Sequence, residues 1–174
     1  MKYLIKVLGF ALLFTTAAQA VTNYNNAPSG AHYASGFEEP ACALTVGADG
    51  VSTVKCTGTQ IGGVGHTNAN VLLAVTATFT GVCQNPGVNR KIVEPFTETK
   101  TDTVEQTIRS TKNGQLVVPE QTTIAETTED FEATFECPNP NWMPEVTSSA
   151  VTFVYTLTFE GFTQQQPFII ISGP

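Results

Sequence analysis

Positive charge and catalytic bases are scarce in this 174-residue chain. Eight lysines and arginines stand against fifteen aspartates and glutamates, giving a formal net charge of −7, and only two histidines occur. An acidic surface repels phosphates and anionic lipid headgroups, so the composition argues against a nucleic-acid partner. The chain also lacks the G-x-S-x-G and H-E-x-x-H motifs of hydrolases and the glycine motifs of nucleotide-binding proteins. We therefore expect a protein that is not an enzyme and uses no cofactor.

Apolar runs long enough to span a bilayer, about 20 residues, are also missing. The N-terminal segment begins with two lysines, continues through the apolar run Val7–Phe14 and ends in Ala18-Gln19-Ala20. This order is typical of a secretory signal peptide. We predict that residues 1–20 are cleaved before Val21. The mature protein would then carry a net charge of −9, have no membrane span, and lie in the periplasm, at the cell surface or in the medium.

Only four cysteines occur, and all of them follow the predicted signal peptide. None has the C-x-x-C spacing of a zinc site, and we expect no metal. An even number of cysteines in an exported chain predicts two disulfides. We pair Cys42 with Cys56 because they would lie nearly opposite each other in a hairpin that turns at 47–50, within reach of a disulfide. Cys83 and Cys137 then form the second bond.

A short phrase occurs twice, at 77–86 and at 133–140. Each copy combines Ala-Thr-Phe, a cysteine and an Asn-Pro pair. We interpret each copy as the end of a strand, so that the bond between Cys83 and Cys137 joins two strand ends at one rim of the domain. On the chain-entropy model, closing a loop of this size contributes about 4 kcal/mol to stability.

Two segments have the pattern of a strand. Val151–Phe159 alternates apolar and polar residues throughout. Val71–Phe79 is apolar on both faces in its first half, which predicts a central position in a sheet, and alternates in its second half. No helical period is evident after residue 20. The sequence predicts an all-β, antiparallel, immunoglobulin-like β-sandwich stapled by two disulfides, with a closed barrel as the alternative. A single domain at 41–174 would follow an irregular arm at 21–40. The predicted core comprises Leu73, Val75, Phe79, Phe135, Phe153, Tyr155, Leu157 and Phe159.

The middle of the chain has a weaker pattern. Segment 88–123 is polar and rich in threonine, and we expect edge strands there, with arms at 102–110 and 115–123 around an Asn-Gly turn. The acidic segment 124–137 lacks a calcium-loop pattern. Glu132 and Glu136 would share one strand face, as a carboxylate pair for glycoside cleavage requires, but many solvated pairs do the same, so we interpret the segment as a strand with a solvated face. Segment 138–149, rich in proline, is predicted to be a loop.

Three residues are candidates for ligand binding. Trp142 is the only tryptophan and lies in the proline-rich loop, where an aromatic side chain suits a sugar or a protein partner. Tyr33 and His66 are further candidates, and His66 lies in the glycine-rich segment 57–70. The alternatives are that Trp142 covers the core and that the glycines form a long turn with positive φ angles.

Three stretches, at 27–36, 56–65 and 137–142, together resemble a group of small secreted bacterial β-sandwich proteins of unassigned function. The resemblance covers most of the mature chain; it implies export and a β fold, and it transfers no site residues. A second similarity is to chaperone–usher pilins, whose C-terminal strands alternate as Val151–Ile171 does. This chain departs from pilins in having Gly173 near its end, where they have an aromatic residue, and in having four cysteines.

These observations favour an exported, non-catalytic β-sandwich that is a structural, adhesive or interaction component. Its partners would be cell-surface or extracellular proteins or glycans. The alternative is a carbohydrate or small-ligand binding module that uses Trp142 and the neighbouring loops. A pilin-like subunit and a hydrolase are less favoured.

Overall fold

The computed structural model describes residues 14–87, 92–163 and 166–174. The first thirteen residues of the predicted signal peptide, and residues 88–91 of the predicted polar segment, lie outside the described residues. The described chain is mostly antiparallel β-structure with one short α-helix. Its elements are β1 (Phe14–Gln19), β2 (Val21–Thr22), η1 (Tyr24–Asn26), β3 (His32–Tyr33), β4 (Ala41–Val46), β5 (Ser52–Cys56), β6 (Thr59–Gly62), β7 (Ala69–Gln84), β8 (Ile92–Ile108), β9 (Leu116–Val118), β10 (Gln121–Ile124), α1 (Thr128–Thr134), β11 (Met143–Phe159) and β12 (Ile169–Gly173).

Three long strands, β7, β8 and β11, form the backbone of the largest sheet, whose order is β2-β12-β11-β7-β8. β7 pairs with β11 on one side and with β8 on the other along its whole length. Its burial alternates strictly, with Val71, Leu73 and Val75 fully buried. The central position expected for this strand is therefore confirmed. At about 3.3 Å per residue the ladder is roughly 50 Å long.

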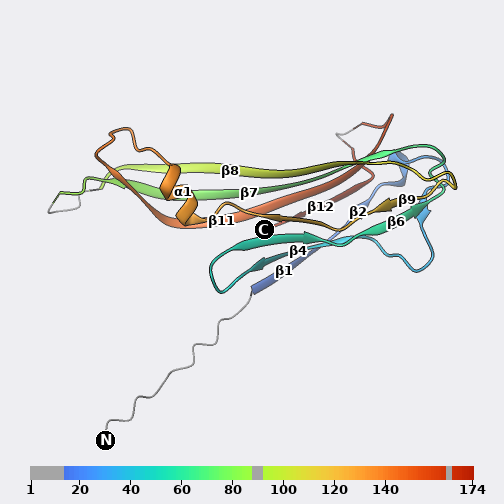
Figure 1. The fold of residues 1–174 in the computed structure, drawn as a ribbon, viewed down its shortest axis with the longest axis horizontal. Helices are drawn as coiled ribbons and strands as arrows, with labels where there is room; N and C mark the ends of the chain where they lie inside the picture. Colours follow the sequence, from blue (N-terminus) through green and yellow to red (C-terminus); the bar gives the residue numbers. More distant parts are fainter. Residues whose placement is uncertain (1–13, 88–91, 164–165) are drawn as a thin grey trace, which may run out of the picture.

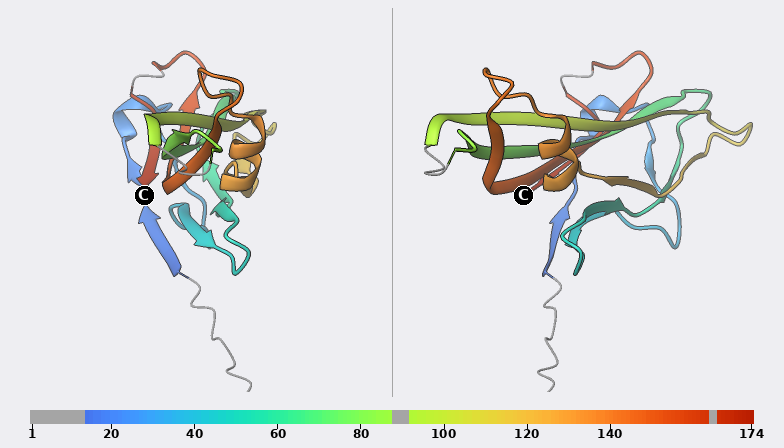
Figure 2. Two further views of the ribbon diagram at one scale, coloured as in Figure 1. Left: turned by 90° about the vertical axis from the view of Figure 1, so that its left-hand side faces the viewer. Right: turned by 60° about the vertical axis from the view of Figure 1, so that its left-hand side comes forward.

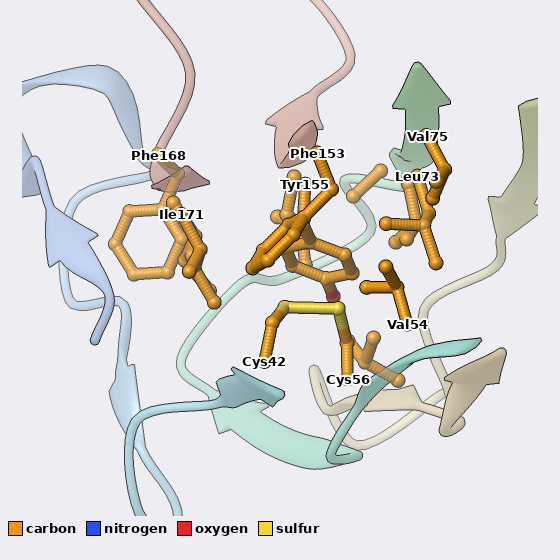
Figure 3. Close-up of a cluster of buried hydrophobic side chains, with 14 of the residues drawn as sticks. Cys42, Val54, Cys56, Leu73, Val75, Phe153, Tyr155, Phe168 and Ile171 are labelled. Atoms are coloured by element: carbon orange, nitrogen blue, oxygen red, sulfur yellow. A yellow bond between two sulfur atoms is a disulfide. The ribbon is translucent and has the colours of Figure 1, made fainter. Parts of the chain in front are cut away.

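Two smaller sheets, β1-β4-β5-β10 and β3-β6-β9, lie below one half of the long sheet in Figure 1. The main core fills the space between the layers (Figure 3). Seven of the eight predicted core residues are buried there, and the exception, Phe135, is only half-buried. The fully buried side chains that the prediction did not name include Phe131, Phe168, Ile61, Leu116, Ile169 and Ile171.

Both predicted disulfides are confirmed. Cys42 and Cys56 lie directly opposite each other in the β4–β5 register, with 4.0 Å between their Cα atoms. Cys83, near the end of β7, is bonded to Cys137, which follows α1, with a Cα–Cα distance of 6.0 Å. Among the described residues no cysteine is free.

The prediction that the chain has no helix is wrong at α1. Thr127 caps the helix by accepting a hydrogen bond from the Asp130 backbone N–H, and Glu129 and Asp130 place negative charge in its first turn. Phe131 then buries the inner face. The second copy of the repeated phrase is thus a helix end and not a strand end, because capping and one buried aromatic outweigh the strand pattern there.

The Asn-Gly turn is confirmed, but its predicted hairpin is wrong. Gly114 has a φ of +69°, and the Thr111 N–H donates to the Gln115 carbonyl across the turn. The two arms then separate, since β8 pairs with β7 whereas β9 pairs with β6. The turn therefore carries the chain from one sheet to another. β11 also begins at Met143, so the predicted loop 138–149 is shorter than expected.

The N-terminal arm is more regular than predicted. β2 pairs with β12, and the Asn23 N–H donates to the Phe168 carbonyl at 2.7 Å. β3 pairs with β6. Immediately before this arm, β1 pairs with β4 in antiparallel register from Phe14 opposite Val46 to Gln19 opposite Ala41. The end of the predicted signal peptide is thus an edge strand in this structure.

Candidate functional site

The end of the long ladder that lies furthest from the two small sheets is shaped by four segments, which we call the α1 end. They are 84–86, Glu94–Glu98, α1 with the following residues 135–142, and the start of β11 at Met143–Val146. Figures 1 and 2 show α1 lying against the long strands, next to the connection that leads to β11.

Four aromatic rings hold α1 on the sheet. Phe131 stacks on Phe79 of β7 with 4.3 Å between ring centroids, and on Phe135 at 5.0 Å. Phe96 of β8 contacts Phe135 at 4.5 Å and Phe131 at 5.9 Å. Aromatic pairs of this kind contribute about 0.5–1.5 kcal/mol each beyond the area that they bury. The rings therefore extend the hydrophobic core to the underside of the helix.

Two further links fix the segment after α1. The Cys83–Cys137 disulfide joins it to the end of β7. The Val146 backbone N–H donates to the Glu132 carboxylate at 2.6 Å, which ties α1 to β11.

Glycine at position 81 of β7 permits close packing in the same region. A side chain there would overlap the Phe96 ring and the β11 backbone. A register irregularity in β11, between Val146 and Ser148, lies opposite Gly81 and Thr80 of β7.

Three shallow hollows lie around this frame. One, of about 400 Å³, is lined by Gln84, Pro86, Glu132, Met143, Pro144 and Glu145. A second, of about 340 Å³, is lined by Phe135, Glu136, Cys137, Pro138, Pro140 and Trp142. The third, of about 330 Å³, shares Phe135, Glu136 and Pro138 with the second, includes Cys83 and extends along Glu94–Glu98 of β8. Of the three predicted site residues, Trp142 lines one of these hollows.

The lining of these hollows is acidic, aromatic and rich in proline. Five glutamates line them, whereas no lysine, arginine or histidine is among the described lining residues; the glutamates are Glu94, Glu98, Glu132, Glu136 and Glu145. Carboxylates accept hydrogen bonds from hydroxyl and ammonium groups, and aromatic faces attract sugar rings and cations. The described carboxylates and aromatic rings therefore suit a basic or polyhydroxylated ligand.

The predicted site residues do not come together. Trp142 is half-buried in the second hollow, next to Met143, the first residue of β11. Tyr33 contacts Phe168, the residue before β12. The first residue of β12, Ile169, pairs with Leu157 near the C-terminal end of β11. Roughly 45 Å of β11 separates these two positions at about 3.3 Å per residue. One site built from both residues is not formed, and a ligand at either of them stays a prediction.

Tyr33 is half-buried and hydrogen-bonded, whereas His66 is exposed in a turn. The Tyr33 hydroxyl forms a 2.7 Å hydrogen bond with the Thr22 hydroxyl. Burial raises the pKa of Tyr33 to about 12, although the hydrogen bond to Thr22 acts in the opposite direction. His66 is exposed in the turn after β6, where Gly63 and Gly65 have φ angles of +72° and +62°. The turn expected for the glycine-rich segment is thus confined to the connection between β6 and β7, where Gly63 and Gly65 use positive φ angles, whereas Gly62 belongs to β6.

Sequence reasoning missed the residues that build the α1 end. Phe131 was assigned to a strand, and Phe96 and Glu132 were given no contact with Trp142's loop. One signal was present: Thr127 stands three residues before Asp130, the spacing of a helix N-cap, and Asp130 is followed directly by the buried Phe131.

Two classes of site are not found in the described part of the chain. No group of three or more histidine, cysteine, aspartate or glutamate side chains is placed to hold a metal ion. No described helix has the length and hydropathy needed to cross a membrane. Comparison with known proteins gave no match, whether to protein-family models, to curated proteins or to solved structures.

Proposed function

We propose that this chain is an exported, non-catalytic β-sandwich of immunoglobulin type whose α1 end binds a partner outside the cytoplasm. The observation that carries the proposal is the grouping of three hollows on one rigid frame. That frame is held by the Cys83–Cys137 disulfide, the aromatic stack and the bond from Val146 to Glu132. Binding sites are commonly placed on loops that a rigid scaffold positions.

The two disulfides support a location outside the cytoplasm, because such bonds persist in oxidising compartments. The acidic lining supports a basic or polyhydroxylated partner. The long strand β8 borders the site, but Pro95 and the charged residues that follow it discourage strand pairing there. The partner would therefore be held by side chains of the α1 end and not by an added strand.

Site-specific photo-crosslinking in the producing cell tests this proposal. A benzophenone amino acid at Trp142 should give a defined adduct, whereas the same residue at Tyr24 should not. Tyr24 is a suitable control because it is 53% exposed and lies beside Phe168, far along the ladder. Equal adducts from the two positions, or none from position 142, would contradict a partner at the α1 end.

A glycan is the second candidate ligand, favoured by Trp142 and Glu136 lining one hollow of about 340 Å³. Sugar recognition combines an aromatic face with carboxylate acceptors. A glycan array should show binding that Trp142→Ala abolishes and Tyr24→Ala leaves unchanged. If both variants bind as the parent does, Trp142 has no part in sugar recognition.

A further inference from the structure

The edge strands of this protein differ in the features that prevent them from pairing with strands of another chain. β8, the outer strand of the long sheet, carries Pro95 and charged side chains along its length, which are features that discourage pairing with another chain. β4 (Ala41–Val46) has the sequence Ala-Cys-Ala-Leu-Thr-Val, with no charge and no proline. Its outer edge is instead covered over all six residues by β1. At the opposite edge of that sheet, β10 packs against β8.

The cover on β4 is the segment that the predicted cleavage would remove. β1 (Phe14–Gln19) ends just before the predicted cleavage site, and Ala18, opposite Cys42, packs partly on the core. β2 would remain, because it pairs separately with β12. In an antiparallel ladder alternate residues direct their N–H and C=O groups toward each neighbour. Loss of β1 therefore leaves backbone donors and acceptors of β4 without partners (Figure 2 shows β1, in blue, at this edge).

We propose that the edge of β4 uncovered by cleavage pairs with β4 of a second copy of this chain. The strand that covers it in this structure is antiparallel and uncharged, with alanine and threonine opposite Cys42 and Leu44. β4 itself is uncharged, and it has alanine or threonine at every second position. Two copies related by a two-fold axis at Ala43 pair antiparallel and place no charge against another. The result is one sheet continuous through both copies.

The proposal rests on the proposed export and cleavage, and its test separates the two. The chain is produced with its own leader in an exporting host, and intact mass identifies the N-terminus. Sedimentation velocity then measures the oligomeric state. The matched variants are Thr45→Lys and Thr53→Lys, because these threonines face each other across β4 and β5, but only Thr45 is on the edge strand. A lysine at the edge blocks strand pairing.

We expect a protein that begins at Val21 and is a dimer. Thr45→Lys should weaken dimerisation at least about tenfold, with 1.4 kcal/mol per tenfold change, and Thr53→Lys should leave it unchanged. An excess of a synthetic Phe14–Gln19 peptide should convert the dimer to a peptide-bound monomer, a measurement that needs no variant to fold.

Two results overturn the inference in different ways. A protein that keeps its leader shows that the edge is never uncovered, and this also removes the cleavage on which the proposed function depends. A protein that begins at Val21 but stays a monomer, or that dimerises equally well with Thr45→Lys, leaves the proposed function intact and removes the β4 interface.

Discussion

Tyr155 provides the sharpest test of how this core is built. Its side chain is fully buried in the main core, and Figure 3 shows its hydroxyl directed toward the Cys42–Cys56 disulfide. That hydroxyl is the one buried side-chain polar atom in the described part of the chain that has no hydrogen-bond partner. A buried unsatisfied polar group costs about 1–3 kcal/mol. Tyr155→Phe removes this group with little change of shape, so we expect the unfolding free energy at pH 7 to rise by about 1 kcal/mol.

The same substitution should change the response to alkaline pH. Burial raises the pKa of Tyr155 well above its usual value of about 10. The folded protein therefore keeps the phenol proton at pH values where the unfolded chain releases it. Ionisation of Tyr155 therefore leaves stability unchanged well below pH 10 and lowers it as pH rises from 10 toward the folded pKa. Between pH 10 and 11 the loss amounts to about 1 kcal/mol, and Tyr155→Phe abolishes it.

Urea titrations at pH 7, 10 and 11 measure both effects. Tyr33→Phe is the control: its hydroxyl is satisfied by Thr22, so its removal should lower stability at pH 7 by about 0.5–1.5 kcal/mol. Because the pKa of Tyr33 is raised to about 12, this control should also reduce the alkaline loss. The reasoning fails if Tyr155→Phe destabilises the protein at pH 7 by more than 1 kcal/mol, or if it leaves the loss between pH 10 and 11 unchanged.

Three other predictions concern the α1 end. Replacing Cys83 and Cys137 with alanine opens a loop of 54 residues and should lower the unfolding free energy by about 4 kcal/mol in denaturant titrations. Removing the other disulfide opens a loop of 14 residues and should lower it by about 3 kcal/mol. Equal losses would contradict the loop-entropy account. Phe131→Ala should cost about 3–5 kcal/mol and speed hydrogen exchange in α1, whereas an unchanged exchange rate would show that the aromatic stack does not hold the helix. Thr127→Ala should cost about 1 kcal/mol through the lost N-cap, and Thr127→Ser should restore it.

Local sequence patterns were sufficient to predict those elements that are determined by residues close together in the sequence. β7 and β11 were predicted because alternation over many residues reports a half-buried strand directly. The pairing of Cys42 with Cys56 followed because only a short turn separates the two strands. The helix α1 was missed because seven residues make less than two full turns, which is too short for a helical period to emerge among threonines and glutamates.

Contacts between distant segments were not predictable in the same way. The turn at Gly114 was predicted correctly, but no pattern in the neighbouring sequence indicates that β9 pairs with β6 and not with β8. Trp142 and Tyr33 were both candidates for ligand binding, and the length of the ladder separates them. The frame of the candidate site likewise depends on Phe96, Phe131 and Phe135 meeting from two elements and the segment after α1.

The long ladder has a mechanical consequence for a domain that is held at its α1 end. A partner bound at Trp142 would pull on β11 along its axis, and β11 is bonded to β7 from Met143 to Phe159. Tension along a strand shears all of its hydrogen bonds together, whereas tension across it would open them one after another. The Cys83–Cys137 bond passes part of the same force to β7 covalently. If a partner binds at Trp142, the β7–β11 ladder would therefore resist stretching along its length.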